Sequence, residues 1–301
     1  MGKRFGLFFI ASIAVFASLC GDSLFRSSAS ANVDDDQYEI LLPLILNRYN
    51  YGPGEVAGRV IDASNGRGLE GVSICFTPQD YCVITLQDGS YSVSNFPGDQ
   101  QVTASLTGYY SVIKDVYVIG GDTVELNFAL SPYITGGNIE LRAVLTWDST
   151  QFWPPDHAEN DLDAHLWLDA ILPVHVFFDN KGDCTNYPNA CLETDFQTGF
   201  GPETVAVRQF EPDTVYYFGV LNYNQGANGV PLIRDTGAHV EVYDETGVVA
   251  SFDVTSSQGD GNFWYIFTYN YSPQQGSWVL TPKNCIVYYS SDIQDIIDQC
   301  P

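Results

Sequence analysis

The chain has 301 residues, of which 14% are aromatic and only 16% are charged, and its formal net charge is −25. So negative a chain repels phosphate backbones and anionic lipid head groups, which argues against nucleic acid as a partner. The same charge attracts cations such as Ca²⁺, although it also serves the solubility of a protein outside the cell.

Residues 1–31 have the pattern of an export signal. A basic start is followed by an apolar run at 7–19, which is too short to span a bilayer comfortably, and by the small residues Ala29-Ser30-Ala31. Cys20 follows a leucine where a lipidated cysteine would follow a small residue, so lipid attachment is disfavoured. We therefore expect a secreted, cell-surface or envelope protein with no transmembrane span in the mature chain.

Residues 32–53 form an acidic leader, in which a proline interrupts the apolar run ILLPLIL and argues against a helix. From 54 to 132 the chain reads as one β-domain, because short runs rich in β-branched and aromatic residues are separated by turn signals such as Asn65-Gly66 and Asp88-Gly89. This spacing predicts a β-sandwich. The expected strands are VAGRVID, VSICF, VITL, YSVSNF, QVTASL, VIKDVYVI and VELNFAL.

The same stretch carries a series of longer motifs in a fixed order. They are GEVAGRVID, GLEGVSICF, DGSYSVSNFPGDQQVTAS, GYYS and VELNFALSP. In this order they resemble the carboxypeptidase regulatory-like domain family, which has a transthyretin-like β-sandwich fold. The resemblance implies a non-catalytic module that spaces, supports or binds within secreted and surface proteins. Related folds bind carbohydrate.

Residues 133–138 read as a short linker and residues 139–282 as a second β-domain. Its apolar residues alternate and show no helical periodicity, which predicts a β-sandwich or a jelly-roll-like barrel. The expected strands are IELRAVLTW, DLDAHLWL, VHVFFDN, TVAVRQF, VYYFGVLNY, HVEVYDE, VVASFDV and NFWYIFTYN.

Residues 283–301 read as a C-terminal tail. Ser291 is placed to cap a short helix that carries Ile293, Ile296 and Ile297 on one side. The predicted fold class is therefore all-β, with two β-sandwich-like domains in tandem and a short disulfide-tied C-terminal tail.

Six cysteines follow the export signal, and they fall in three close pairs. Six cysteines allow 15 connectivities, but pairing between sequence neighbours is the simplest, and export favours disulfides. A zinc site is the rival interpretation, and it is weak because there is no C-x-x-C and no suitably spaced histidine. The pairs are Cys75 with Cys82, Cys184 with Cys191, and Cys285 with Cys300.

The stretch DLDAHLWLDA at 161–170 alternates in an unusual way. Period 2 places Asp161, Asp163 and His165 on one face of a strand, and Leu162 and Leu166 on the other. Neighbours on one face lie roughly 6.5–7 Å apart, a spacing that suits carboxylates converging on one hard cation. We expect the apolar row to seal a sandwich interior and the acidic row to lie outside it.

A second resemblance covers about residues 141–270. The motifs LTWD, NDLDAHLW, VHVFFDN, LETD and GFGPETV are similar to those of the YfaP-like family of uncharacterised bacterial envelope proteins. The resemblance implies a secreted or periplasmic β-rich module, without an established activity or ligand. The pair Cys184 and Cys191, which precedes LETD, departs from that pattern and could alter the acidic loop.

Two interpretations of the acidic residues remain open. One is a divalent cation site, with Ca²⁺ as the ion, built from Asp161, Asp163, Asp195 and Glu203, while His165 holds a carboxylate rotamer. The other is that these acids make turn and backbone hydrogen bonds at the edge of a sheet, as Asp often does. The sequence favours the second interpretation.

Motifs for catalysis were not found: the chain has no H-E-x-x-H, no G-x-S-x-G and no Walker loop. Trp153, in a proline-rich loop, and Trp167, on the acidic face, are the aromatic residues best placed for exposure. Together with His165 they are the candidate ligand-binding residues, because exposed rings beside acids suit the apolar faces of sugars.

The sequence thus predicts an exported, non-catalytic binding or structural module. Its expected partners are a polysaccharide or another surface protein. The alternative is an accessory module of a secreted hydrolase, or a weak glycan hydrolase.

Overall fold

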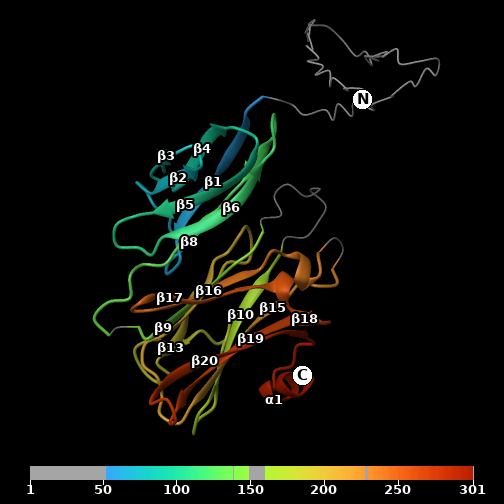
Figure 1. Cartoon of the computed structure of the whole chain (residues 1–301). Helices are drawn as coiled ribbons and strands as arrows, with labels where there is room; N and C mark the ends of the chain where they lie inside the picture. Colours follow the sequence, from blue (N-terminus) through green and yellow to red (C-terminus); the bar gives the residue numbers. More distant parts are fainter. Residues whose placement is uncertain (1–51, 138, 149–159, 228–229, 301) are drawn as a thin grey trace, which may run out of the picture. The chain divides into compact units, whose positions relative to one another are not determined.

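The computed structural model describes residues 52–137, 139–148, 160–227 and 230–300, and it holds two β-sandwich-like domains in tandem (Figure 1). The predicted export signal, nearly all of the acidic leader and Trp153 lie outside these residues. In the described part of the chain, no helix is both long enough and apolar enough to cross a membrane.

The first sandwich is built from two sheets, with the strand orders β4-β1-β7 and β3-β2-β5-β6. Strand β8 pairs with the second half of β1. The strands are β1 (Gly54–Asp62), β2 (Ser73–Thr77), β3 (Tyr81–Ile84), β4 (Ser90–Asn95), β5 (Gly98–Ser105), β6 (Val112–Val118), β7 (Thr123–Glu125) and β8 (Phe128–Leu130).

Every second side chain along these strands points between the two sheets, and these side chains are mostly apolar. Val56 and Val60 of β1 are fully buried there with Ile74 of β2 and Val102 of β5. The Asp88-Gly89 turn requires its glycine, because φ at Gly89 is +83° and a Cβ would lie 2.1 Å from the carbonyl oxygen of Val60.

The stretch VELNFAL, expected as one strand, is interrupted in the structure. β7 and β8 both run parallel to β1, but Leu126 and Asn127 separate them. The backbone N–H of Arg59 donates to Oδ1 of Asn127 at 2.8 Å, so a side chain replaces a ladder bond between backbones at that point.

The second sandwich also has two sheets, with the orders β11-β10-β15-β19-β20-β18 and β12-β13-β14-β9-β16-β17. The strands of the first sheet are β10 (Leu162–Asp169), β11 (Val174–Val176), β15 (Val215–Asn222), β18 (Gln258–Gly259), β19 (Phe263–Ser272) and β20 (Ser277–Val287). Those of the second are β9 (Leu141–Thr146), β12 (Gly182–Asp183), β13 (Ala190–Thr194), β14 (Glu203–Val207), β16 (His239–Asp244) and β17 (Gly247–Asp253), and two 3₁₀ turns lie at Ile233–Asp235 and Val254–Ser256.

Strand β20 was not among the predicted strands, and it crosses the boundary placed at residue 282. Its first half reads SWVLTP and pairs with β19, and the pairing continues to Val287. Cys285 therefore belongs to the sheet and the tail begins after it. The alternation of β20 is weak because Pro282 and two polar residues interrupt the apolar pattern.

Helix α1 (Ile293–Gln299) in the tail begins one residue later than predicted. Its N-cap is Asp292, whose carboxylate accepts a hydrogen bond from the backbone N–H of Gln294 at 2.9 Å, rather than Ser291. Ile296 is fully buried, in a second apolar cluster that includes Trp167, Phe263 and side chains of β15 and β20. The tail thus covers the outer face of the β10-containing sheet.

The structure forms three disulfides between sequence neighbours. Cys75 to Cys82 joins β2 to β3, Cys184 to Cys191 closes the turn before β13, and Cys285 to Cys300 ties α1 to β20. In the chain-entropy model, closing a loop of about 15 residues, like that of the tail, contributes roughly 3 kcal/mol.

Candidate functional site

Strand β10 is buried on both of its faces. Leu162, Ala164 and Leu166 pack into the core between the two sheets, as the alternation predicts. Asp163 and His165 on the opposite face are also buried, with 3% and 0% of their surface exposed. The expectation that this polar row lies outside was wrong, because Phe177, and Tyr289 of the tail, pack against the ring of His165 on that face.

Three separate segments bring acidic side chains to β10. Asp161 immediately precedes β10 and Asp163 is its second residue, Asp195 follows β13, and Glu203 is the first residue of β14. The carboxylate of Glu203 accepts a hydrogen bond from the backbone N–H of Ala164 at 2.6 Å. It reaches this donor because β11 pairs only with residues 166–168 of β10 and leaves the first half of that edge open.

The four acids lie close enough for their charges to affect one another, and we refer to them as the carboxylate cluster. Burial, together with the charges of Asp161 and Asp195, raises the pKa of Asp163 to about 8. Burial raises the pKa of Asp161 to about 6, with a contribution from the charge of Asp195. Burial also raises the pKa of Glu203, aided by the charges of Asp163 and Asp195 and opposed by the hydrogen bond from Ala164.

One oxygen of each acid in the carboxylate cluster is buried and receives no hydrogen bond from an N–H group or a hydroxyl group. Glu203 and Asp195 nevertheless lie within hydrogen-bonding reach of each other, and this contact also raises the pKa of Glu203. Native structures leave few such atoms, because an unpaired buried acceptor costs about 1–3 kcal/mol and a charged one more. Asn160, the residue before Asp161, adds a fifth oxygen of this kind. The atoms are Oδ1 of Asn160, Oδ1 of Asp161, Oδ2 of Asp163, Oδ1 of Asp195 and Oε1 of Glu203.

A lysine supplies positive charge at the rim of the cluster. Nζ of Lys181 lies 2.6 Å from Oδ2 of Asp195, and the lysine side chain is 56% exposed. One half-exposed ammonium group offsets little of the charge that four ionised carboxylates would carry. Within the described residues, no three His, Cys, Asp or Glu side chains already form a metal site, so a cation here would require the carboxylates to turn toward it.

The histidine of the motif belongs to a buried stack. Nδ1 of His165 and Nε2 of His175 lie 2.8 Å apart, which is a hydrogen bond between two imidazoles. The ring of His175 lies between Trp167, at 4.0 Å, and Phe177, at 4.2 Å. Burial lowers the pKa of His175 to about 4 and that of His165 well below its usual value, so both rings are neutral near pH 7.

This stack corrects the predicted ligand-binding residues. Trp167 is only 5% exposed and His165 is fully buried, so neither offers a surface to a sugar. Trp167 was expected in solvent because it shares the acidic face of β10, and that face is covered. His175 and Lys181 were not singled out from the sequence. The available signal for His175 was its position in VHVFF, where it stands between two apolar residues of an expected strand.

The first sandwich is similar to a known domain family. Residues 55–131 match the carboxypeptidase regulatory-like domain family. This agrees with the resemblance seen in the sequence and covers that sandwich from β1 to the end of β8. The YfaP-like resemblance of the second sandwich stays a prediction.

Curated relatives share only part of the chain. Human carboxypeptidase D is 35% identical over 87 residues, which are 29% of this chain and 6% of that protein. Carboxypeptidase D of Anas platyrhynchos is 32% identical over 120 residues, which are 38% of this chain and 8% of that protein. The chain therefore spans less than a tenth of these relatives.

Solved structures show distant likeness. A DUF3823 family protein from Parabacteroides merdae has a TM-score of 0.22 and 15% identity, with 56% of this chain and 90% of that chain covered. A streptococcal ancillary pilin has a TM-score of 0.24 and 13% identity, with 74% and 68% covered. Likeness at this level assigns no ligand.

Proposed function

We propose that this chain is an exported, non-catalytic binding protein whose second sandwich holds a calcium ion at the carboxylate cluster. One observation carries the proposal: four acids from three segments of the chain converge, and each has a buried oxygen to which no N–H group or hydroxyl group donates. Burying charge without compensation is costly, and a bound cation supplies that compensation.

The donor atoms favour calcium over other metals. All of them are carboxylate or amide oxygens, which hard cations prefer, whereas zinc sites use sulfur or imidazole nitrogen. Calcium accepts six to eight oxygens in a flexible geometry, and magnesium demands a near-octahedral arrangement with several waters. A cluster whose acids must turn to meet the ion therefore suits calcium better.

A second arrangement of the same residues involves no metal. The raised pKa values of Asp163 and Glu203 allow these two groups to keep their protons near neutral pH and to share hydrogen bonds within the cluster. This arrangement and the calcium site differ in their response to added ions, so one experiment separates them.

That experiment is thermal unfolding of the purified protein in EDTA and in millimolar CaCl₂. A bound ion at about 100 times its dissociation constant stabilises the fold by roughly 2.7 kcal/mol, so the melting temperature should rise by several degrees. Asp163→Asn should remove the rise. Asp169→Asn, which alters an exposed acid on the same strand, should keep it. An unchanged melting temperature of the unaltered protein in calcium would leave proton sharing as the explanation.

Export and the binding role are supported by other features. Three disulfides suit an oxidising compartment, and the first sandwich matches a regulatory-like domain rather than a catalytic one. We propose a polysaccharide or another surface protein as the partner. The alternative, an accessory module of a secreted hydrolase or a weak hydrolase, predicts release of reducing ends from a polysaccharide, and a binding protein predicts retention without product.

A further inference from the structure

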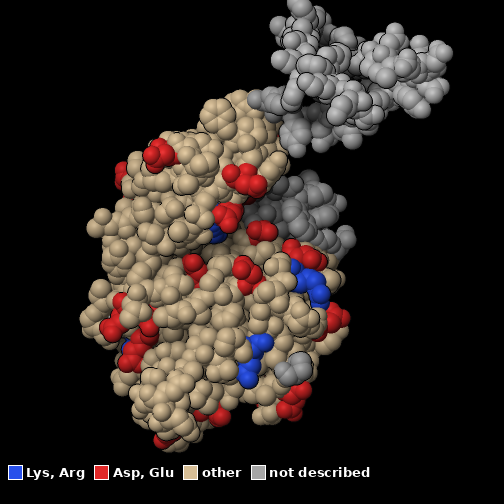
Figure 2. Space-filling view, viewed as in Figure 1, with Lys and Arg blue, Asp and Glu red and all other residues tan. Residues whose placement is uncertain are grey.

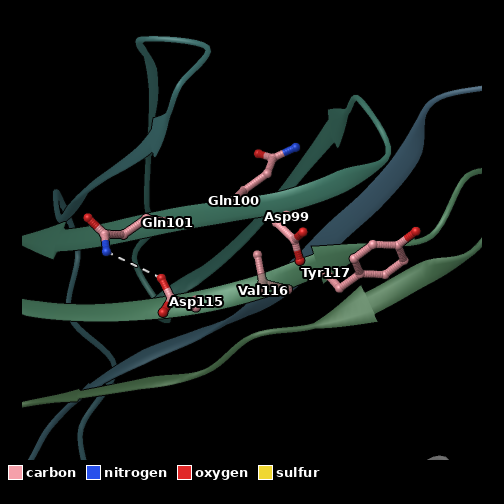
Figure 3. Close-up of a pocket in the computed structure, with 6 residues that line it drawn as sticks. All are labelled: Asp99, Gln100, Gln101, Asp115, Val116 and Tyr117. Atoms are coloured by element: carbon pink, nitrogen blue, oxygen red, sulfur yellow. Dashed lines mark hydrogen bonds between the residues drawn. The ribbon is translucent and has the colours of Figure 1, made fainter.

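The first sandwich carries a groove over strands β5 and β6, shown in Figure 3, which we call the β5–β6 groove. Its volume is about 480 Å³, and it is a shallow depression that is open to solvent rather than an enclosed cavity. Six residues line it, namely Asp99, Gln100, Gln101, Asp115, Val116 and Tyr117.

The register of the sheet places the polar side chains of the groove in two rows. Asp99 lies opposite Tyr117 and Gln101 lies opposite Asp115, and all four project from the outer face of the sheet. Nε2 of Gln101 donates to Oδ1 of Asp115 at 3.3 Å, which holds these two side chains side by side (Figure 3). Strand β6 ends the strand order of this sheet.

Tyr117 is the aromatic member of the groove, and 52% of its surface is exposed. An aromatic ring half in water offers a flat apolar surface next to a hydroxyl group. The carboxylates of Asp99 and Asp115 accept hydrogen bonds, and the amide of Gln101 both donates and accepts them. An apolar plane flanked by such groups matches a sugar ring, which has C–H bonds on its faces and hydroxyl groups around its rim.

The charge of the groove restricts the kind of sugar. Two of the six lining residues are acidic and none is basic. Figure 2 shows, on the face it displays, acidic side chains spread widely and few basic ones. Uronic acids and sulfated sugars would meet repulsion at Asp99 and Asp115, whereas neutral sugars would not.

We infer that the β5–β6 groove binds a neutral saccharide, with Tyr117 stacking on a sugar ring and Asp99, Asp115 and Gln101 bonding its hydroxyl groups. This saccharide site rests on the proposed binding role, lies on the first sandwich and does not depend on calcium at the carboxylate cluster. A sheet face that is merely solvated is the competing explanation, and it predicts no saturable binding.

The test is affinity electrophoresis of the whole protein through native gels that contain a polysaccharide. Galactomannan, mixed-linkage β-glucan and amylopectin are the neutral probes, and polygalacturonate and alginate are the acidic ones. The protein should be retarded by at least one neutral probe, equally in EDTA and in calcium, and by neither acidic probe. Retardation in calcium alone would place binding at the carboxylate cluster and would overturn the inference.

Two matched variants locate the binding surface. Tyr117→Ala should weaken retardation at least about tenfold, because stacking and area burial are lost together. Ile84→Ala removes a side chain that is 59% exposed on the same face of the same sheet, but on β3, and should change nothing. Both variants should melt like the unaltered protein. No retardation by any neutral probe, or equal retardation of the Tyr117 variant, would overturn the inference.

Discussion

Glu203 of β14 accepts a hydrogen bond from the backbone N–H of Ala164 in β10 at 2.6 Å, so one side chain joins the two sheets of the second sandwich at the carboxylate cluster. The bond uses Oε2 and leaves Oε1 buried, with no N–H group or hydroxyl group donating to it. The same carboxyl group is within hydrogen-bonding reach of Asp195, so Glu203 both joins the sheets and belongs to the carboxylate cluster.

Substitution of Glu203 can separate the effect of its hydrogen bond to Ala164 from the effect of its negative charge. Glu203→Gln keeps an oxygen for the Ala164 N–H but removes the negative charge, so we expect a folded protein that no longer gains stability in calcium. Glu203→Ala removes both and should lower the free energy of unfolding by about 1–3 kcal/mol as well. Urea unfolding in EDTA and in CaCl₂ measures both effects. A calcium response retained by the Gln variant would remove Glu203 from the site.

The raised pKa values predict how stability depends on pH without calcium. The folded pKa values of Asp161 and Asp163, about 6 and about 8, exceed the ordinary value of 3.8. The protonated forms of these two acids therefore stabilise the folded protein fully below pH 4. This contribution to the free energy of unfolding, on the order of a few kcal/mol, is lost as the pH rises to about 8. Urea unfolding in EDTA from pH 5 to 9 should show the loss. Asp163→Asn should reduce it, and calcium should reverse it in the unaltered protein.

Lys181 should compete with a cation for Asp195. Its ammonium nitrogen lies 2.6 Å from Oδ2 of that acid, so the lysine and a bound cation would be attracted to the same carboxylate. Lys181→Met keeps the apolar stem and removes the charge, so we expect calcium to bind a few-fold more tightly. Isothermal titration with CaCl₂ measures the change. Lys283→Met, at an exposed position on β20, is the control. Weaker binding after Lys181→Met would show that the lysine assists the site.

The buried imidazoles predict an opposite pH dependence on the acidic side. The folded pKa of His175, about 4, is below the ordinary value of 6.5. The neutral ring therefore stabilises the folded protein fully above pH 6.5, and this stabilisation is lost as the pH falls toward 4. His175→Phe keeps a ring between Trp167 and Phe177 and cannot be protonated. Its free energy of unfolding should therefore fall less than that of the unaltered protein between pH 6.5 and 4, as measured by urea unfolding. Parallel curves would contradict this.

Substitution of two adjacent residues, Ser291 and Asp292, tests which of them caps α1. Asp292→Ala removes the acceptor for the Gln294 N–H and should destabilise the helix by about 1 kcal/mol. Ser291→Ala should have little effect, because Ser291 contributes its backbone carbonyl to Trp167 rather than a side-chain cap. Amide hydrogen exchange of residues 293–299 reports the difference. Equal exchange rates in the two variants would argue against Asp292 as the cap.

Local pattern alone predicted much of the second sandwich. The period of two in DLDAHLWL identifies Leu162 and Leu166 as core residues, because the side chains of a strand alternate whatever surrounds it. The same reasoning placed Asp163 and His165 together on the other face. It could not say that this face is covered, because Tyr289, whose ring packs against His165, lies more than a hundred positions further along the chain.

The carboxylate cluster shows the same division. Asp195 and Glu203 were named from the sequence as partners of Asp161 and Asp163, and the structure brings the four charges within reach of one another. The β13–β14 hairpin and the contact from Glu203 to Ala164 determine this proximity, and no local pattern encodes either. The β5–β6 groove is of the same kind, because Asp99 meets Tyr117 only through strand register.

By itself, then, the sequence determined most of the strands, their inward faces and the simplest pairing of the cysteines, since alternation and short loops are local properties of the chain. The tertiary structure decided which outward faces are covered, which acids share a buried space and which aromatic ring stays in water. Burial depends on segments that are distant in sequence, and burial sets the pKa of Asp163 and the exposure of Tyr117 and Trp167.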